Sequence, residues 1–232
     1  MTTPPTAPAT ASPQETVRRV LLAVFALVLL VDLGSLVVDA DKGHWIAKPL
    51  LMPLLVALVL LRGGPRLLVA ALLFGWGGDV FLLSGAEWAF LAGMGSFAVG
   101  HVCYLVLFRR TCEGRPSAVL APAYGLALVV AVALLWPGLP ADLRVPVAGY
   151  ALLLTAMAWR SSTLGAVAGL GGLFFLVSDL IIASGVAEWP QPPVPDVWIM
   201  LIYGAGQLLL TLGVLSHALP RDAAAPSLTV AP

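Results

Sequence analysis

The chain has 232 residues, of which 60% are hydrophobic and only 10% are charged, and its mean hydropathy is +0.99. A soluble domain carries about 25% charged residues, so this composition indicates an integral membrane protein. The formal net charge is zero, which gives no indication of a nucleic-acid partner. The two cysteines, Cys103 and Cys112, lie in an apolar run and a basic loop. We expect both to be free thiols, because neither has the spacing of a metal or disulfide motif.

The two ends of the chain differ in composition from its middle. Residues 1–16 are rich in Thr, Pro and Ala, and residues 220–232 are rich in Ala and Pro; we expect both to be disordered tails. Arg18 and Arg19 precede the first apolar run, as in a signal peptide. That run is too long, and no small-residue cleavage site is evident, so we interpret it as the first membrane span. Residues 17–219 are the expected membrane domain.

Apolar runs separated by helix breakers define the spans, each of which needs about 20 mostly apolar residues. The breakers are residues 63–65 (Gly-Gly-Pro), 114–116 (Gly-Arg-Pro), 136–138 (Trp-Pro-Gly) and the proline-rich stretch 190–195. The sequence therefore predicts an all-α protein with eight membrane-spanning helices, of which the second and sixth are short. The predicted spans are Val20–Val38, Lys48–Leu61, Leu67–Leu83, Trp88–Phe108, Ala118–Trp136, Val145–Trp159, Leu164–Ala183 and Val197–Ala218.

The basic residues segregate when the eight spans alternate across a membrane. Of the 12 Lys and Arg, only Lys42, Lys48 and Arg144 fall on the side opposite the N-terminus, and the other nine share the N-terminal side. Cytoplasmic loops carry an excess of Lys and Arg, so the pattern predicts that both termini are cytoplasmic. In a bacterium, the expected location is the cytoplasmic (plasma) membrane.

Two stretches of the chain share a local pattern. Residues 79–88 and 179–189 each begin with Asp, have Ser-Gly from the fifth following residue, and end in Glu-Trp. The dipeptides Gly100-His101 and Gly206-Gln207 extend the match into the following spans. The third and seventh spans run in the same direction, so we expect a parallel two-fold internal repeat. Two such halves would face each other across one site.

Asp79 and Asp179 are carboxylates placed deep inside predicted spans. A charged side chain near the bilayer centre costs about 2.5–3.5 kcal/mol on insertion scales, which makes each a functional-site hypothesis. At the helical rise per residue, they lie about 12 Å and about 14 Å below the outer boundary. Five polar side chains on other turns share this outer half of the bilayer, and we expect them to converge with the aspartates: His101, Tyr104, Ser178, Tyr203 and Gln207.

Lys48 stands on the side of the membrane that is depleted of basic residues. The predicted second span begins at Lys48, with Pro49 in the favoured first-turn position. A cation at a helix start opposes the helix dipole. These two penalties indicate that Lys48 meets an anion, which could be Asp79, Asp179 or the phosphate of a ligand.

Each of these residues also has a purely structural interpretation. The aspartates could form a salt bridge with Lys48 that only fixes helix packing. For His101, a role in packing or hydrogen bonding between helices explains its position as readily as a role in a functional site. We expect Asp32, near the outer end of the first span, to reach water by snorkelling. Tyr150 fits an interfacial aromatic belt. Ser84 and Ser184 are expected to bond to carbonyls of their own helices.

The polar residues belong to a series of short motifs along the spans: Lys48-Pro49-Leu50 with Met52, Gly78-Asp79-Val80-Phe81-Leu82, Gly93-x-x-x-Phe97, Gly100-His101-x-x-Tyr104, Ser178-Asp179 and Tyr203-x-x-x-Gln207. In their order across the second, third, fourth, seventh and eighth spans, these motifs resemble the YhhN-like (lysoplasmalogenase) family over roughly residues 20 to 218. The resemblance implies an eight-span membrane hydrolase that cleaves the vinyl ether of lysoplasmalogens to a fatty aldehyde and a glycerophospho-base.

The polar residues fit that chemistry. A vinyl ether is hydrolysed by protonation of its β-carbon, and a carboxylate can then stabilise the cation or activate water, as in glycosidases. We expect Asp79 and Asp179 to be the acid and the base, in an order that the sequence does not assign. Lys48 would hold the phosphate or favour ionisation of one aspartate. The other candidates would position water and the head group, and neither a metal nor another cofactor is required.

The sequence is also compatible with three other functions. Opposed acidic residues in repeats also describe proton-coupled carriers, although a parallel repeat without interrupted helices favours an enzyme. A structural protein would close Lys48 and the aspartates into a dry ion pair. A lysolipid ester or amide hydrolase would need a nucleophile, for which Ser178 is the candidate, with His101 as its base. A lysophospholipid from the bilayer is the expected partner of the favoured enzyme.

Overall fold

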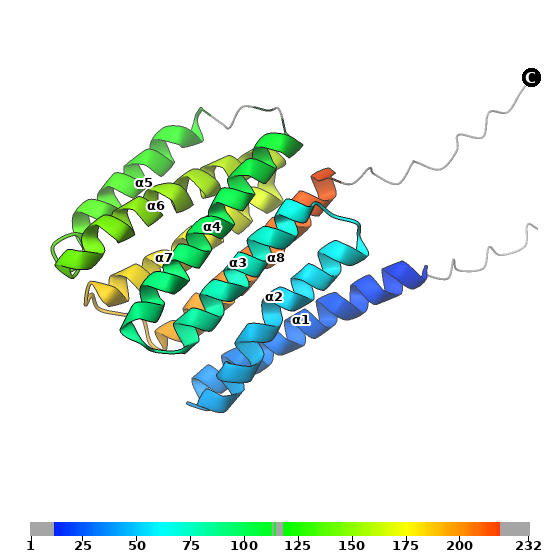
Figure 1. The fold of residues 1–232 in the computed structure, drawn as a ribbon, viewed down its shortest axis with the longest axis horizontal. Helices are drawn as coiled ribbons and strands as arrows, with labels where there is room; N and C mark the ends of the chain where they lie inside the picture. The colour runs from blue at the N-terminus through cyan, green and yellow to red at the C-terminus, as the bar shows by residue number, and fades with distance from the viewer. Residues whose placement is uncertain (1–11, 113, 115–117, 219–232) are drawn as a thin grey trace, which may run out of the picture.

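The computed structural model describes residues 12–112, 114 and 118–218, and every regular element among them is helical. The eight α-helices of this part of the chain form one bundle (Figure 1). Their bounds are α1 (Pro13–Val37), α2 (Asp41–Leu61), α3 (Arg66–Leu83), α4 (Glu87–Thr111), α5 (Leu120–Leu135), α6 (Ala141–Ser161), α7 (Ala166–Val186) and α8 (Pro195–Ala218), with a short 3-10 turn, η1 (Ser162–Leu164), before α7.

Each predicted span corresponds to one of these helices, which confirms an all-α, multi-pass membrane protein. Among the described residues, seven helices are long and apolar enough to cross a membrane, and α5 is a shorter apolar helix of 16 residues. The prediction that the second and sixth spans are short was wrong. Both α2 and α6 have 21 residues, because polar first turns extend them beyond the apolar runs.

The first helix begins inside the predicted N-terminal tail. Ser12 caps it by accepting a hydrogen bond from the Glu15 amide, and Pro13 occupies the first helical position, where its missing N–H is no loss. Residues 13–16 are therefore helical. The rest of the predicted tail, and the predicted C-terminal tail at 220–232, lie outside the described residues.

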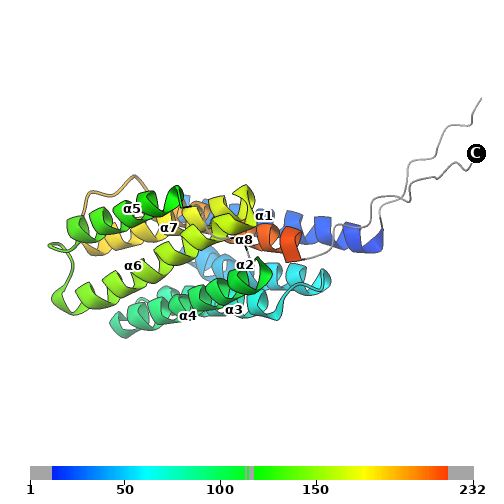
Figure 2. The ribbon, with the colours of Figure 1, turned by 90° about the horizontal axis from the view of Figure 1, so that it is seen from above.

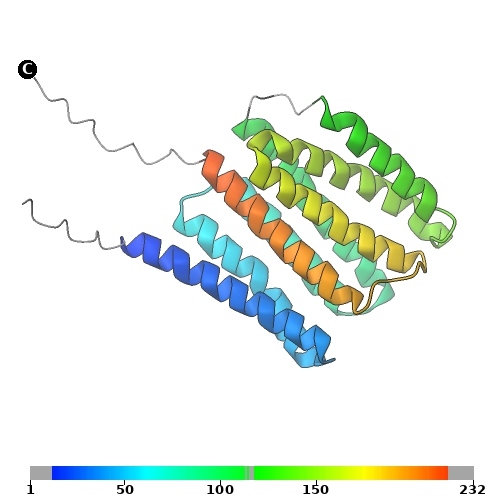
Figure 3. The same ribbon diagram turned by 180° about the vertical axis from the view of Figure 1, so that it is seen from behind.

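The helices form two layers. One layer contains α2, α3, α4 and α6, and the other contains α1, α8, α7 and α5, as the views from above and behind show (Figures 2 and 3). The closest pairs are α3 with α4 and α7 with α8. These four helices lie at the centre, so side chains from α3, α4, α7 and α8 can meet inside the bundle.

Glycines let α4 approach α3 in the same way that α8 approaches α7. A Cβ atom at Gly100 would lie 3.1 Å from the carbonyl oxygen of Ala71, and one at Gly206 would lie 3.0 Å from that of Gly171. Phe74 and Phe174 occupy matching places beside these glycines. The two helix pairs therefore pack in the same register, with an offset of 100 residues between α3 and α7.

Two prolines inside α2, Pro49 and Pro53, shape the helical turn that carries Lys48. The structure begins α2 at Asp41, so Pro49 is an interior residue and the prediction that Lys48 opens a helix was wrong. Pro53 has no N–H to donate to the Pro49 carbonyl. Trp76 of α3 supplies the missing donor, with its Nε1 at 2.9 Å from that oxygen. This bond ties the Lys48 turn of α2 to the helix that carries Asp79.

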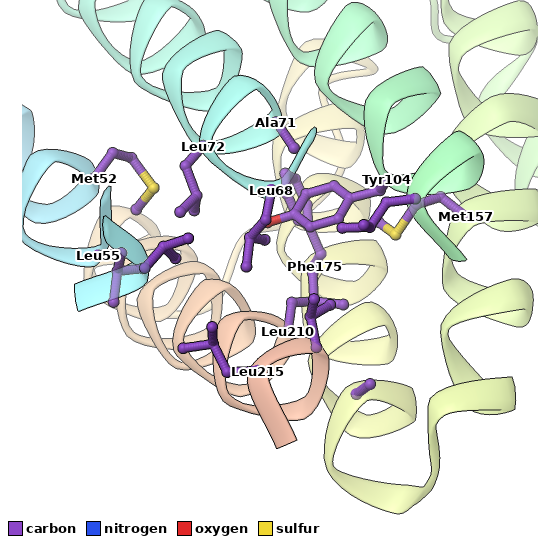
Figure 4. Close-up of a cluster of buried hydrophobic side chains, with 14 of the residues drawn as sticks. Met52, Leu55, Leu68, Ala71, Leu72, Tyr104, Met157, Phe175, Leu210 and Leu215 are labelled. Carbon is purple, nitrogen blue, oxygen red and sulfur yellow. The ribbon is translucent and has the colours of Figure 1, made fainter. Parts of the chain in front are cut away.

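One apolar core holds the central helices together. Leu68 and Leu72 of α3 and Leu210 of α8 are completely buried in it, and Tyr104 and Phe175 reach into it from α4 and α7 (Figure 4). In a membrane, close packing rather than water exclusion stabilises such contacts. The core fixes the rings of Tyr104 and Phe175, which also border the polar groups described below.

The close approach of α7 and α8 generates a stability prediction. A Cβ atom at Gly171 would lie 2.6 Å from the Leu210 amide nitrogen, which is backbone and cannot move aside. We expect Gly171→Ala to lower stability by about 1–3 kcal/mol, as overpacking does. Thermal unfolding in detergent measures the change. Gly125→Ala on α5, where no atom lies within 4 Å, is the matched control and should not be destabilised; equal stability of the two variants would contradict the packing.

Candidate active site

Asp79 of α3 lies at the end of a chain of buried hydrogen bonds. Its Oδ2 accepts from the Tyr203 hydroxyl of α8 at 2.8 Å. Gln207, one turn further along α8, donates from Nε2 to the same Tyr203 oxygen at 3.4 Å. Tyr104 of α4 donates to Gln207 Oε1 at 2.8 Å. The prediction that these four residues converge is confirmed, and all four are almost completely buried.

Two glycines on α3 make room for this chain. A Cβ atom at Gly75 would lie 3.1 Å from Gln207 Nε2, and one at Gly78 would collide with the Phe97 ring. Larger residues at these positions would push α8 or the α4 ring away from Asp79. The glycine-rich sequence of α3 is therefore what lets the amide and the ring pack directly against the helix backbone.

Asp179 of α7 has a separate set of partners. The Tyr150 hydroxyl of α6 donates a short hydrogen bond to Asp179 Oδ2. The same hydroxyl lies 3.1 Å from His101 Nε2 of α4. His101 is buried, and its other ring nitrogen, Nδ1, has no hydrogen-bond partner among the described residues. Three helices thus meet at Tyr150, and one buried histidine nitrogen remains available to a water or a substrate.

A layer of aromatic rings separates the two aspartates. Phe175 lies 5.2 Å from the Tyr203 ring and 4.8 Å from the His101 ring, measured between ring centres, and Phe97 packs edge-on against Phe175 and Tyr203. The aspartates share no hydrogen bond, but they are close enough to interact electrostatically. They are two neighbouring carboxyl groups on opposite sides of one aromatic layer.

Of the two aspartates, Asp179 borders two cavities between the helices. Asp179 lines a cavity of about 100 Å³ between α5, α6 and α7, and another of about 50 Å³ that reaches Leu82 and Met94. Tyr150 lines both cavities as well, and the remaining lining is mainly apolar. Asp79 lines neither. The two aspartates are therefore unequal: Asp179 faces open space, and Asp79 is enclosed.

Lys48 and Ser178 lie differently from the sequence expectation. Lys48 is 9% exposed, and no carboxylate of the described residues is within salt-bridge distance of it, although its charge acts on Asp79. Ser178 donates its hydroxyl to the Ile199 carbonyl of α8 at 3.2 Å and does not contact His101. Lys48 is thus a nearby charge rather than an ion-pair partner, and Ser178 joins two helices.

Three residues near the site were misjudged or missed from the sequence. Tyr150 is a partner of Asp179 rather than part of an interfacial belt. Asp32 is fully buried, not snorkelled, because His44 of α2 covers it with Nδ1 at 2.8 Å from Asp32 Oδ1. His44 precedes Lys48 by four residues, a spacing that places both on one helix face and could have indicated a polar stripe on α2.

Other expectations about single residues were met. Ser84 and Ser184 donate to the carbonyls of Phe81 and Ile181 in their own helices. Cys103 and Cys112 are free.

Comparisons with known proteins give a consistent result. The model of the YhhN family matches residues 43–214. The chain is 37% identical over 163 residues to human lysoplasmalogenase TMEM86B, covering 68% of each chain. It is 34% identical over 189 residues to the Sus scrofa protein of that name, covering 75% of this chain and 77% of the relative.

A bacterial relative gives a similar match. The chain is 31% identical over 176 residues to a lysoplasmalogenase of Mycobacterium tuberculosis (strain CDC 1551 / Oshkosh), covering 70% of this chain and 66% of the relative. No solved structure matches the chain at a significant level.

The buried Asp32–His44 pair generates a second stability prediction. Removing only the histidine leaves a buried carboxylate without a partner, which typically costs about 3–5 kcal/mol. We expect His44→Leu to be strongly destabilised and the double variant Asp32→Leu, His44→Leu to recover much of the loss, because apolar replacement of a buried pair is often tolerated. Unfolding midpoints in detergent measure both. A double variant less stable than His44→Leu would contradict the pairing.

Proposed function

Because the chain belongs to the YhhN family, we propose that it is an intramembrane hydrolase that cleaves the vinyl ether bond of lysoplasmalogens. The products would be a fatty aldehyde and a glycerophospho-base. The relatives named above carry the name of this activity. The observation that carries the proposal is the position of Asp179, a carboxyl group at the wall of a largely apolar cavity inside the bundle.

The reaction requires a proton on carbon. In the first step, the protonated Asp179 carboxyl gives its proton to the β-carbon of the vinyl ether, and the double-bond electrons form the new C–H bond. The product is an oxocarbenium ion. In the second step, water adds to the α-carbon, and the Asp179 carboxylate takes the proton that this water loses. One carboxyl group thus serves first as acid and then as base, as in retaining glycosidases.

The resulting hemiacetal then breaks its bond to the glycerol oxygen. The leaving oxygen takes a proton, the hemiacetal hydroxyl loses one, and the aldehyde forms. Tyr150 is positioned to orient Asp179 throughout, because its hydroxyl donates to the carboxyl group and also meets His101. Nδ1 of His101 has no partner among the described residues, so it is a further hydrogen-bonding atom near Asp179 and Tyr150. We assign this atom the role of binding the water that reacts.

Asp79 would act electrostatically from behind the aromatic layer. Two carboxyl groups close together in a medium of low dielectric do not both ionise readily. Tyr203 donates a hydrogen bond to Asp79, as Tyr150 does to Asp179. The positive charge of Lys48 acts on Asp79, so it is the group that favours a charged Asp79 and, by repulsion between the carboxylates, a protonated Asp179. A negative charge at Asp79 would also stabilise the oxocarbenium ion, because charges interact strongly in a dry site.

The alternatives from the sequence find less support. An ester or amide hydrolase would need Ser178 beside His101, but Ser178 bonds to α8 and His101 to Tyr150. A purely structural ion pair would need Lys48 in contact with an aspartate. A carrier would need a path to both sides, whereas a broad groove between α5 and α7 opens on the outer surface of the bundle and adjoins the Asp179 cavity. Such a lateral opening suits a lipid substrate.

We also propose that both termini are cytoplasmic and that α7–α8 repeats the arrangement of α3–α4. The segregation of the basic residues supports cytoplasmic termini, and the matching contacts of Gly100 and Gly206 support a parallel repeat of α3–α4 in α7–α8. A reporter fused to the C-terminus that is active only in the cytoplasm tests the orientation. An inactive reporter on a folded, membrane-inserted protein would reverse it.

Aldehyde release by the purified protein in detergent tests the activity. We expect release from a lysoplasmalogen and none from an ester-linked lysolipid. Asp179→Asn should lower turnover by about 10²–10⁴-fold, the range for loss of acid–base catalysis. Asp79→Asn should lower it by about 10²–10³-fold, the range for loss of an electrostatic stabiliser. Tyr150→Phe should lower it by a smaller factor, because the carboxyl group remains.

Asp142→Asn is the matched control, since Asp142 is an exposed aspartate at the start of α6, and it should keep the parent activity. A folded parent protein that releases no aldehyde would refute the proposed function. The same preparation would then be tested for proton flux, to find out whether the protein is a proton-coupled carrier. Full activity of Asp179→Asn would refute the mechanism but not the activity.

A further inference from the structure

Arg144 of α6 lies at one end of the cavity that Asp179 borders. Its Nε donates to the Leu139 carbonyl at 3.1 Å, and its guanidinium carbon lies 5.9 Å from the centre of the Trp136 ring. These contacts fix the side chain, while no carboxylate of the described residues is within salt-bridge distance of it. A positioned guanidinium that faces a cavity without an anionic partner is a candidate anion site.

The opposite end of the cavity continues into an open apolar groove of about 630 Å³ between α5 and α7. Ala127 of α5 and Leu176 of α7 line both the cavity and the groove, so the two spaces adjoin there. The groove runs along α7 as far as Ala166. From Asp179 to Ala166 the helix rises about 20 Å, a length comparable to an extended long hydrocarbon chain.

We propose that Arg144 binds the phosphate of a single-chain lysophospholipid whose hydrocarbon chain lies in the groove between α5 and α7. This assignment rests on the proposed function and identifies the site that its substrate would occupy. It also transfers the phosphate-binding role from Lys48, which lines neither the cavity nor the groove.

The order of the groups along the bundle matches the order of groups in such a lipid. Arg144 precedes Tyr150 by about 9 Å of helical rise along α6, and Tyr150 bonds to Asp179. A phosphate held by Arg144 would therefore place the glycerol and its ether oxygen at Asp179, because the guanidinium reaches toward the cavity. The chain would then continue past Leu176 in the direction away from Arg144.

This arrangement also fits a bilayer. A lipid with its head group near the start of α6 and its chain along α7 has the orientation of lipids in the leaflet at that end of the bundle. The groove is open along the side, so the chain could enter from the leaflet without leaving apolar surroundings. The groove is lined mainly by one apolar face of α5 and one of α7, which suits a hydrocarbon chain.

Binding of two lipids that the enzyme cannot cleave tests the phosphate site. One is a lysophosphocholine with a saturated ether chain, and the other is the corresponding alkylglycerol, which has no phosphate. We expect Arg144→Gln to weaken binding of the lysophosphocholine by about 10- to 100-fold, as loss of a charge-assisted hydrogen bond does. Its affinity for the alkylglycerol should equal that of the parent.

Lys42→Gln is the matched control, because Lys42 is an exposed cation at the start of α2, and it should bind both lipids as the parent does. Retained alkylglycerol binding also shows that the Arg144 variant is folded. Parent-like binding of the lysophosphocholine by Arg144→Gln, or an equal loss of both lipids, would overturn the assignment.

A second pair of variants tests the groove. Ala127→Trp would fill the junction of groove and cavity, whereas Leu126→Trp adds the same bulk at a neighbouring, highly exposed position of α5 that lines neither space. We expect Ala127→Trp to weaken binding of long-chain lysophosphocholine by about four-fold per excluded methylene and to affect short chains little. Equal effects of the two variants, or equal losses for both chain lengths, would place the chain elsewhere.

These binding experiments separate the two proposals. A parent that binds the saturated lipid through Arg144 but releases no aldehyde keeps the site and loses the proposed function. A parent that releases aldehyde while Arg144→Gln binds and turns over substrate normally keeps the function and loses the site.

Discussion

Two carboxyl groups inside a lipid-embedded bundle each require a hydrogen-bond donor, and this requirement explains how the central helices are arranged. Polar groups without partners are costly where no water can reach them. Tyr203 of α8 satisfies Asp79 of α3, and Tyr150 of α6 satisfies Asp179 of α7. Each bond crosses between helices, so the carboxyl groups hold the bundle together. Glycines bring the same helix pairs close together: a Cβ atom at Gly75 would lie 3.1 Å from Gln207 Nε2 of α8, and one at Gly172 would lie 2.9 Å from the Cα atom of Ala158 of α6.

The two aspartates share a sequence pattern but not an environment. Gly75 leaves room for Gln207 and Tyr203 beside Asp79, whereas the matching position on α7 is Phe175, which fills the centre of the aromatic layer. Asp179 borders two cavities, and Asp79 lines neither of them. In the proposed mechanism, these two environments give the acids separate roles, one as a fixed charge and one as the group that exchanges a proton with substrate.

The number of helices and the placement of Asp79 and Asp179 inside them could be predicted, because both follow from the cost of polarity in lipid, which composition and depth in a span reveal. The role of Tyr150 as a partner of Asp179 could not be predicted, because a tyrosine in a span looks the same in the sequence whether it faces lipid or a carboxyl group. Asp32 was misjudged because its partner, His44, lies on the next helix. The start of α2 was misplaced because Pro49 suits a first turn, and the bond from Trp76 of α3 that compensates for Pro53 cannot be read from the sequence.

Protonation of a carbon atom by an acid in the membrane is the central claim, and hydrolysis in heavy water tests it most directly. The account predicts one deuterium on the carbon next to the aldehyde group, because exchangeable protons of the acid come from solvent. The aldehyde is reduced as it forms and analysed by mass spectrometry. An aldehyde without deuterium at that carbon would contradict the account, since the bond would then have been broken without adding a proton to the double bond.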